Sequence, residues 1–379
     1  MRRFWLLFAQ TVTVVLALYF VYAALRPAPR PPAAGAGATS MAQGVGPASY
    51  RDAAGRAMPA VVNILTTQAP KRAGNPMLKD PFFKKFFGER HPEGDDDDDE
   101  DGSSLGSGVI VSAAGYILTN NHVVEAADQI EVVLADGRKA PAKVVGLDPE
   151  TDLAVIQIKL DKLPVIVLGQ VEQARVGDVV LAIGNPFGVG QTVTMGIISA
   201  LGRNNLHINH FEDFIQTDAA INFGNSGGAL VDTGGKLLGI NSAIYSQSGG
   251  SVGIGFAIPV STARAVMDEI IKSGHVVRGW IGVESQDITP ELASSFSLPQ
   301  QHGAIIAGIV KNGPADRAGM KPGDILLAVE GKPVADTTEM LNLIAKLVPG
   351  GKAKMTVLRK NRESTLDIVV GKRPDTNRH

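Results

Sequence analysis

The sequence TDAAINFGNSGGAL, residues 217–230, places one serine, Ser226, among three glycines, Gly224, Gly227 and Gly228. Glycine allows positive φ angles and close backbone approach, so this run predicts a tight turn that presents a hydroxyl while neighbouring N–H groups converge. Such a turn suits a catalytic nucleophile. An ordinary surface turn rich in Gly, Asn and Ser has the same composition. The rest of the chain has to distinguish the two interpretations.

A serine nucleophile needs a base within hydrogen-bond reach and a third group that orients the base. Among seven histidines, His122 is the best candidate, because it ends the strand-like run GYILTNN and its backbone is therefore anchored. A lone histidine there is otherwise a packed or solvent-facing residue. Asp152 is the first residue of the apolar run DLAVIQI. Burying a carboxylate there costs free energy unless a partner such as an imidazolium compensates its charge. The chain order His122, Asp152, Ser226 is a known order for an acyl-transfer triad. The expected oxyanion-hole donors are the backbone N–H groups of Gly224, Asn225 and Ser226.

Short β-branched runs separated by turn signals extend from Ser104 to about Pro259, among them SGVIVSAAGYILTN, DVVLAIGNPFG and QTVTMGIISA. This pattern predicts antiparallel sheets closed as barrels or sandwiches. Residues 260–273 carry an apolar stripe at helical spacing, with Gly274 as C-cap, and predict a packed helix. A separate mixed unit follows from about Val276 to Gly371. Its predicted strands lie near 280–284, 304–310, 325–330, 353–359 and 364–370, and its helices near 290–296 and 337–347.

Composition describes a globular chain and excludes several functions. The 379 residues are 44% hydrophobic, enough to bury more than one core, and length favours two or three domains. Formal net charge is −2, and no Lys/Arg cluster is present, so nucleic-acid binding has no support. Because the chain has no cysteine, disulfides, thiolate metal sites and a cysteine nucleophile are excluded.

The N-terminal run Phe4–Leu25 contains no charged residue and is long enough to cross a bilayer as one helix. Arg2 and Arg3 before it weakly favour a cytoplasmic N-terminus. A cleaved signal peptide is the alternative, but the Ala-x-Ala triplets at 34–38 lie far beyond the apolar run. We therefore favour an uncleaved anchor, followed by a Pro/Ala/Gly-rich tether at 26–48 and a catalytic part outside the cytoplasm.

The acidic run 95–101 contains the pattern DxDxDG, which is reminiscent of a calcium loop. Its twelfth position is Gly108, where such a loop needs a bidentate glutamate, so we reject a calcium site and predict neither metal nor cofactor. A solvated loop is the simpler interpretation. Phenylalanines at 82–87 are candidates for docking on another surface or on the same subunit.

Several segments together resemble one known family, the HtrA (Deg) serine proteases of chymotrypsin fold. They are TNNHVV (119–124), TDLAVI (151–156), GNPFG (184–188), TDAAINFGNSGGAL (217–230) and GIGFAI (253–258). RGWIGV (278–283) and GPADRAGMKPGDILLAVEGKPV (313–334) resemble a PDZ domain. With one anchor and one PDZ domain, the chain is most similar to the membrane-anchored DegS/AlgW type.

The resemblance implies a mostly β fold, in which a chymotrypsin-like double β-barrel protease domain precedes one α+β PDZ domain and follows an N-terminal transmembrane helix. The implied boundaries are a membrane anchor at 1–25, a tether at 26–48, a trypsin-like serine protease domain at 49–275 and a PDZ domain at 276–379. Phe223 stands where the family often has proline, and this difference questions how rigidly the oxyanion loop is held.

The resemblance also implies binding residues. The substrate-binding positions are Ile221, Ser242, Ala243, Ile244 and Tyr245, whose apolar character predicts cleavage after small or medium aliphatic residues. Ordinary β-core packing explains Ile221 and Ile244 as well. In the PDZ unit, backbone N–H groups of Trp280, Ile281 and Gly282 would hold a peptide C-terminal carboxylate.

The implied function is a periplasmic serine endopeptidase of the envelope stress response, anchored by a single pass in the bacterial inner membrane. C-terminal peptides of misfolded outer-membrane proteins would activate it, and a membrane-anchored anti-sigma factor would be cleaved. Homotrimers through the N-terminal part of the protease domain are implied, without cofactor or nucleic acid. The alternatives are a general periplasmic quality-control protease or chaperone, a catalytically silent scaffold, and a PDZ adaptor.

Overall fold

The structure, a computed structural model, describes residues 49–67, 104–185, 190–206, 208–222, 224–244, 251–295 and 302–374. Four expected segments lie outside the described residues: the anchor Phe4–Leu25, the tether 26–48, the phenylalanines at 82–87 and the acidic run 95–101. Within the described ranges, no helix has the length and apolar character needed to cross a membrane. All described residues from Ser49 onward belong to one compact unit.

The first half of the N-terminal region is a seven-stranded antiparallel sheet ordered β5-β4-β1-β2-β3-β7-β6, an open strand order in place of the first of the two expected barrels. Its strands are β1 (Val61–Thr67), β2 (Ser104–Ile110), β3 (Tyr116–Thr119), β4 (Gln129–Val133), β5 (Lys139–Pro141), β6 (Lys143–Asp148) and β7 (Leu153–Gln157). A short helix, α5 (Asn121–Val124), directly follows β3. The sheet therefore brings the end of β3 next to the start of β7, because these strands pair antiparallel with Thr119 opposite Ala154.

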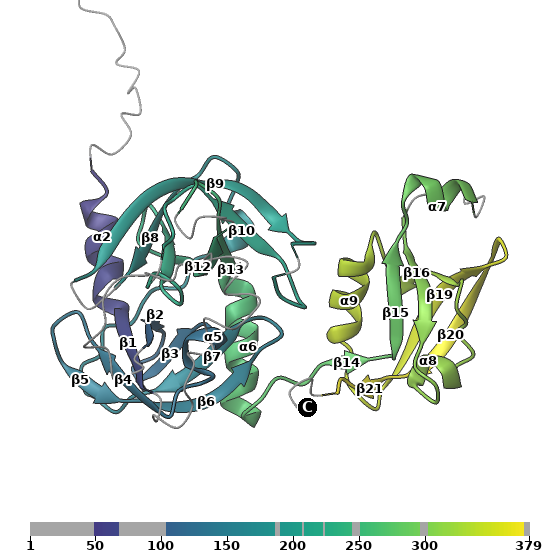
Figure 1. Cartoon of the computed structure of the whole chain (residues 1–379), viewed down its shortest axis with the longest axis horizontal. Coiled ribbons are helices and arrows are strands. Elements are labelled where there is room, and N and C mark those ends of the chain that lie inside the picture. Colours follow the sequence, from purple (N-terminus) through teal and green to yellow (C-terminus); the bar gives the residue numbers. More distant parts are fainter. Residues whose placement is uncertain are drawn as a thin grey trace, which may run out of the picture. The chain divides into compact units, whose positions relative to one another are not determined.

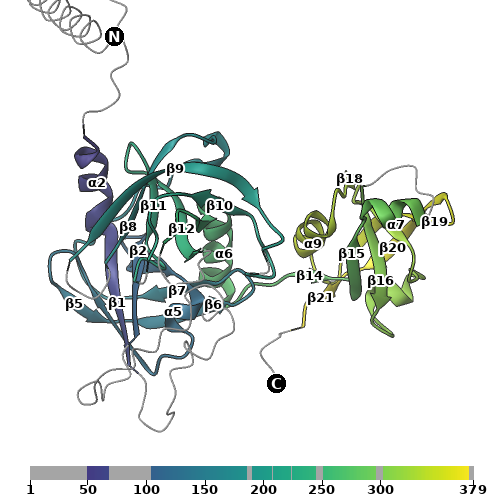
Figure 2. The same ribbon diagram turned by 45° about the horizontal axis from the view of Figure 1, so that its top comes forward.

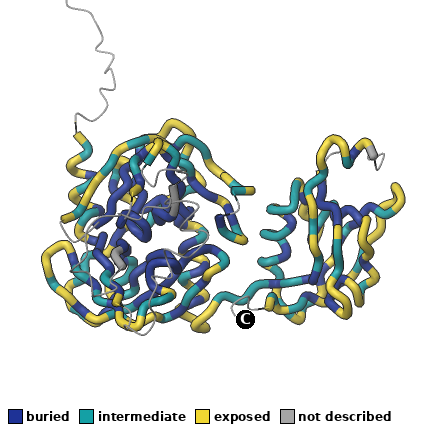
Figure 3. The backbone as a smooth tube through the Cα atoms, viewed as in Figure 1, coloured by how far each residue is buried: buried dark blue, intermediate teal, exposed yellow. Residues whose placement is uncertain are grey.

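The second half is a closed barrel of six strands ordered β10-β13-β12-β11-β8-β9 (Figures 1 and 2). Its strands are β8 (Val179–Gly184), β9 (Thr192–Arg203), β10 (Phe214–Thr217), β11 (Ala229–Asp232), β12 (Leu237–Ile244) and β13 (Gly255–Pro259). The helices α2 (Arg51–Ala57), η1 (Met58–Ala60) and η2 (Val171–Gln173) complete this region. Both halves contribute to one continuous apolar core, seen as the dark interior in Figure 3.

The predicted helix is confirmed as α6 (Val260–Ser273), which ends at Gly274 with a left-handed φ of 79°. It buries Val260, Ala263, Val266 and Ile270, at the i, i+3, i+4 spacing of one helix face. This face contacts strands of both halves, β6 and β7 of the sheet and β12 and β13 of the barrel. Helix α6 thus ties the two halves together.

The C-terminal unit has its own core and confirms the expected mixed α/β composition. Its main sheet has the order β15-β16-β17-β19-β20, with β18 paired to β17, and β14 pairs separately with β21. The strands are β14 (Gly279–Trp280), β15 (Val283–Asp287), β16 (Ala304–Ile309), β17 (Ile325–Val329), β18 (Lys332–Pro333), β19 (Lys352–Arg359), β20 (Arg362–Val369) and β21 (Gly371–Lys372). The helices are α7 (Pro290–Ser295), α8 (Pro314–Arg317) and α9 (Thr337–Ala345).

Candidate active site

Three segments far apart in the sequence carry the predicted triad. His122 lies in α5, Asp152 immediately precedes β7, and Ser226 lies in the turn between β10 and β11. All three residues are almost entirely shielded from solvent, with exposed fractions of 7%, 5% and 6% respectively. The catalytic candidates therefore come from both the seven-stranded sheet and the barrel.

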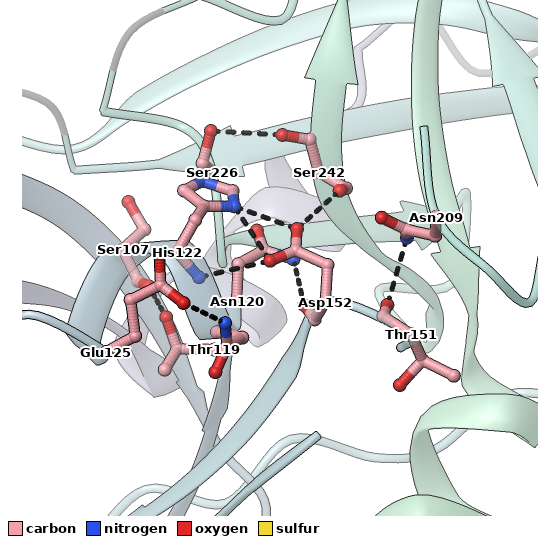
Figure 4. Close-up of polar contacts among 11 residues, drawn as sticks. Ser107, Thr119, Asn120, His122, Glu125, Thr151, Asp152, Asn209, Ser226 and Ser242 are labelled. Atoms are coloured by element: carbon pink, nitrogen blue, oxygen red, sulfur yellow. Dashed lines mark hydrogen bonds and ion pairs between the residues drawn. The ribbon is translucent and has the colours of Figure 1, made fainter. Parts of the chain in front are cut away.

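The imidazole of His122 faces the Asp152 carboxylate (Figure 4). Nδ1 of His122 lies 2.9 Å from Oδ1 and 2.8 Å from Oδ2 of Asp152, and the His122 backbone N–H donates to Oδ1 at 3.1 Å. The Asp152 carbonyl accepts from Asn120 Nδ2 at 2.9 Å and from the Asn121 N–H at 3.1 Å. Asp152 is held in a left-handed conformation with φ 57°, which is uncommon for a non-glycine residue. These contacts fix both the backbone and the carboxylate of Asp152.

Ser242 connects the serine to the aspartate. Its Oγ donates to Asp152 Oδ2 at 3.0 Å, and its carbonyl accepts from Ser226 Oγ at 3.2 Å (Figure 4). The register of β12 against β13 shifts between Asn241 and Ala243, and such bulges re-aim side chains next to active sites. Ser226, Ser242, Asp152 and His122 thus form one connected hydrogen-bonded group.

Sequence reasoning placed Ser242 only among the substrate-binding residues and missed its contact with the carboxylate. Nothing in the local sequence indicates which of two faces a strand hydroxyl takes at a bulge. The carboxylate accepts from both the His122 backbone and the Ser242 hydroxyl. These two donors hold the carboxylate in position beside the imidazole.

Two of the three glycines in the turn have the positive φ angles that glycine permits. Gly224 and Gly227 have φ angles of 86° and 81°. A Cβ on Gly227 would lie 2.1 Å from the Ser107 carbonyl oxygen and 2.4 Å from Thr119 Oγ1, closer than any real contact. A side chain at position 227 is therefore excluded by both backbone conformation and space.

One expected oxyanion donor differs from the prediction. The Asn225 N–H donates to the Asn222 carbonyl at 3.0 Å, so this amide is already committed within the turn. A donor held by a backbone carbonyl is not directed at a substrate oxyanion. The proposed hole is accordingly reduced to the N–H groups of Gly224 and Ser226.

The expected substrate-binding residues are only partly described. Ile221 has no exposed surface, and its side chain packs against Gly255 of β13, where a Cβ would lie 2.9 Å from Ile221 Cδ1. The backbone of Ala243 and Ile244 belongs to β12, pairing with Phe256 and Gly255, whereas their side chains and all of Tyr245 lie outside the described residues. Phe223 also lies outside them.

The expected carboxylate-binding loop of the PDZ unit lies at the start of that unit. Trp280 pairs with Gly371 through β14 and β21, and Ile281 is 2% exposed and packs in the PDZ core. Gly282 follows with a left-handed φ of 76°. The Gly282 carbonyl accepts from the Val310 N–H at 2.9 Å, which fixes the end of this loop.

An ionic cluster lies next to the segment that carries Asp152. Arg278 donates to both carboxylate oxygens of Asp148, at 2.7 and 2.6 Å, and to Glu150 at 3.2 Å. Arg373 donates to the other oxygen of Glu150. Burial lowers the pKa of Arg278, but the hydrogen bond and charge of Asp148 and the charge of Glu150 outweigh it, so the pKa is raised and the guanidinium stays charged.

Across the described ranges, no group of three or more His, Cys, Asp or Glu residues is arranged to hold a metal ion. The chemistry that these side chains offer is nucleophilic: a hydroxyl, an imidazole oriented by a carboxylate, and backbone amides in a glycine-rich turn. Together, these groups are the ones that catalysis of acyl transfer requires.

Comparison with known families and proteins agrees with this geometry. Residues 106–240 match the trypsin-like peptidase domain, and residues 279–370 match the PDZ domain. A probable periplasmic serine endoprotease, DegP-like, from Chlamydia trachomatis is 47% identical over 297 residues, covering 78% of this chain and 60% of that protein. One of the same description from Chlamydia pneumoniae is 45% identical, covering 86% and 69%. The chain thus spans about 60% to 70% of the length of these relatives.

Among solved structures, the HtrA-type protease AlgW with a tripeptide has a TM-score of 0.75 and 51% identity, covering 87% of this chain and 99% of that one. AlgW with a decapeptide has a TM-score of 0.73 and 52% identity, with coverage of 86% and 99%. The serine endoprotease from Yersinia pestis has a TM-score of 0.64 and 39% identity, covering 87% and 100%. At these identities the similarity extends beyond the fold to the family.

Proposed function

This chain belongs to the HtrA-type serine proteases, in which a trypsin-like peptidase domain is followed by a PDZ domain, and we propose that it is a periplasmic serine endopeptidase. The observation that carries the proposal is the connected group Ser226–Ser242–Asp152–His122. In it, the proposed base and the orienting carboxylate are in direct contact, and the proposed nucleophile is linked to the carboxylate through Ser242.

In the proposed reaction, His122 takes the proton of Ser226 as the hydroxyl attacks the scissile carbonyl. Asp152 holds Nδ1 of His122, which selects the tautomer and stabilises the imidazolium. The N–H groups of Gly224 and Ser226 stabilise the tetrahedral oxyanion. His122 then protonates the leaving amine, and water hydrolyses the acyl-enzyme through the same base.

Substrate binding is proposed along β12, where an extended peptide adds to the backbone at 242–244. Ile221, Ile244 and Tyr245 are the proposed walls of the primary specificity pocket. Because no acidic residue is among them, cleavage after small or medium aliphatic residues is expected.

The proposed regulator is the PDZ unit, with the N–H groups of Trp280, Ile281 and Gly282 binding a peptide C-terminal carboxylate. AlgW structures that contain a tripeptide and a decapeptide support peptide recognition in this family. We propose that C-terminal peptides of misfolded outer-membrane proteins bind there and favour the active oxyanion turn. Such coupling requires that the peptide binds the active arrangement more tightly than the inactive one.

The proposed cellular location and substrate follow from the resemblance to the membrane-anchored DegS/AlgW type. We propose that Phe4–Leu25 anchors the protease in the inner membrane, with the catalytic and PDZ domains in the periplasm. The substrate would be a membrane-anchored anti-sigma factor, cleaved in the envelope stress response. Relatives named as periplasmic endoproteases support the compartment.

We also propose a homotrimer. Its implied contact, the N-terminal part of the protease domain, lies largely outside the described residues, and one surface of the barrel is a second candidate for an intersubunit contact. Val193, Met195 and Ile197 alternate along β9 and are 37%, 59% and 38% exposed. Val176 near the start of β8 is 63% exposed. Contiguous exposed apolar patches are typical of protein contact sites.

Labelling with a serine-directed fluorophosphonate tests the enzyme assignment. The wild-type chain, with C-terminal peptides supplied, should be labelled, whereas Ser226→Ala should not. Equal labelling of both would refute Ser226 as the nucleophile, and absence of labelling in the wild type would favour a silent scaffold.

Deleting residues 276–379 tests the regulatory route. Cleavage of an internally quenched peptide should be stimulated by C-terminal peptides in the full chain and should lose that stimulation in the deletion. Stimulation that survives the deletion would contradict the PDZ route. Rapid degradation of denatured casein without any added C-terminal peptide would favour general quality control.

A further inference from the structure

Ser107 is a fully buried serine on β2, outside the triad and outside every site predicted from the sequence. We propose that Ser107 is a positioning residue, whose hydroxyl and backbone N–H fix the orientation of the oxyanion turn around Ser226. The inference rests on the proposed protease function and assigns one more residue to the same reaction.

Two hydrogen bonds from Ser107 reach both ends of the turn. Its Oγ donates to the Gly224 carbonyl at 2.5 Å, and its backbone N–H donates to the Ser226 carbonyl at 2.8 Å. Because a peptide group is planar, holding its carbonyl also holds the N–H on the other side of the same bond. Ser107 therefore fixes the peptide groups after Gly224 and after Ser226.

The far sides of these two peptide groups are also held. The Asn225 N–H donates to the Asn222 carbonyl at 3.0 Å, and the Gly227 N–H donates to the Asn241 carbonyl at 2.8 Å. The peptide between Asn225 and Ser226, which carries the proposed oxyanion donor of Ser226, thus lies between two fixed neighbours. Its carbonyl accepts from the Gly228 N–H at 2.9 Å, which holds the Ser226 N–H of the same planar peptide within the segment whose two ends Ser107 fixes.

The direction of the Ser107 hydroxyl proton follows from its partners. A hydroxyl has one donor and two acceptor sites. Ser107 Oγ accepts from the Asn185 N–H at 2.8 Å, which leaves its single proton for Gly224. Thr119 Oγ1 donates to the Ser107 carbonyl at 2.7 Å, so the backbone that bears this hydroxyl is itself fixed.

The placement of these residues in the fold explains why a side chain, that of Ser107, makes the contact with the turn. Ser107 and Thr119 belong to the seven-stranded sheet, whereas Asn185 and Gly224 lie next to strands of the barrel. One hydroxyl bridges the halves at the turn where the oxyanion would form. Removing it would leave the Gly224 carbonyl and the Asn185 N–H buried without this partner.

A purely structural tie between the halves is the competing role, and steady-state kinetics separate the two. A positioning residue should change kcat and the binding of transition-state analogues, because the oxyanion exists only in those states. A structural tie should change thermal stability and leave the kinetics of the folded fraction unchanged. Both readouts are needed on the same variants.

The test compares Ser107→Ala with Ser112→Ala in the full chain, using an internally quenched peptide that the wild type cleaves. Ser112 lies just after β2, and its Oγ accepts from the Ala114 N–H, so it controls for hydroxyl loss on the same hairpin. For Ser107→Ala we expect kcat to fall about 10- to 100-fold with KM changed by less than about 2-fold, since losing an oxyanion donor outright costs about 10²–10³-fold. Ser112→Ala should keep the wild-type kcat.

Inhibitor binding provides the second readout. A peptide boronate, whose adduct with Ser226 places an oxygen in the oxyanion hole, should bind Ser107→Ala more weakly by a factor similar to the loss in kcat. The peptide amide of the same sequence should bind both proteins equally. If Ser107→Ala does not fold, Ser107→Cys, which keeps a side chain of similar shape with a weaker donor, should show a partial loss in the same two measurements.

The outcomes distinguish this inference from the function on which it rests. A wild-type chain that neither cleaves peptides nor reacts with a fluorophosphonate would overturn both. An active wild type with unchanged kcat and boronate affinity in the folded Ser107 variant would overturn this inference alone. Equal losses for the boronate and the peptide amide would also overturn it.

Discussion

The Ser242 hydroxyl donates to Oδ2 of Asp152 at 3.0 Å, from β12 of the barrel to the residue that precedes β7 of the sheet. The same oxygen lies 2.8 Å from Nδ1 of His122. A carboxylate oxygen that accepts from both groups is held in position for the imidazole. We expect Ser242 to act on the proposed reaction through Asp152 as well as through its backbone.

Replacing Ser242 with alanine should lower kcat about 10-fold, because a hydrogen bond to a charged group contributes about 1.5–3 kcal/mol and part of it is replaced by water. The backbone carbonyl that accepts from Ser226 remains in this variant. KM should change little. The control is Ser199→Ala, which removes a half-buried hydroxyl from β9 of the same barrel. A Ser242 variant with wild-type kcat would contradict this role.

Replacing Asp152 with asparagine should lower kcat about 10⁴-fold, because an amide that faces Nδ1 selects the wrong imidazole tautomer. Asparagine tolerates the left-handed conformation with φ 57° that this position requires, so the fold should persist. Kinetics and circular dichroism on the same sample check both statements. A loss of less than 10-fold would show that Asp152 does not orient the base.

Replacing Gly227 with alanine should abolish activity and destabilise the chain by more than about 3 kcal/mol, because backbone strain and a direct clash add together. Gly137 is the matched control. Its φ is 85°, but a Cβ there would meet nothing within 4 Å. Gly137→Ala should cost only about 1–2 kcal/mol for the left-handed backbone. Equal changes in urea denaturation for the two variants would argue against the close approach at the turn.

Replacing Arg278 with methionine should destabilise the chain by about 3–5 kcal/mol, because Asp148 would remain buried without its charged partner. The side chains of Arg278 and Asp148 are only 10% and 4% exposed. The exposed pair Lys139–Glu131, with side chains 58% and 46% exposed, provides the control. Lys139→Met should change stability by less than about 1 kcal/mol. Thermal unfolding of the two variants distinguishes these outcomes.

Replacing Ile197 with lysine should dissociate the proposed homotrimer, because a charge would enter an apolar contact. Val348, which is 75% exposed in the PDZ unit, gives the matched substitution Val348→Lys. Size-exclusion chromatography with light scattering should report a lower mass only for Ile197→Lys. An unchanged trimer would exclude the β9 surface as its interface, and a monomeric wild type would refute the trimer itself.

Local signals in the sequence were sufficient for much of the fold. Helix α6 was predicted with its observed limits because both the stripe and the Gly274 cap are encoded within a few residues. Four of the five strands predicted for the C-terminal unit lie near their observed positions, whereas the strand predicted near 280–284 is divided between β14 and β15, with Ile281 and Gly282 outside both. By contrast, the two-residue strands β14 and β21 and the four-residue helix α8 carry too little periodicity to predict, since they depend on tertiary contacts.

In the candidate site too, features encoded by local sequence were predicted, whereas features that depend on tertiary contacts were not. Residue type and spacing predicted His122 and Asp152, and the structure brings their side chains into contact. The commitment of the Asn225 N–H to Asn222 was not predictable, because a glycine-rich turn does not encode the direction of each peptide. The contacts of Ser107 and Ser242 were missed for a related reason, since they join segments that are distant in the sequence.

The proposed reactive atoms are divided between two halves of the domain, with the imidazole and carboxylate on the sheet and the nucleophile on the barrel. A slight slip of one half over the other would separate them while each half kept its strands. Mild heating or a low concentration of denaturant should therefore abolish activity before spectroscopy detects unfolding. A neighbouring subunit or a bound peptide that holds the two halves together would therefore directly control the catalytic rate.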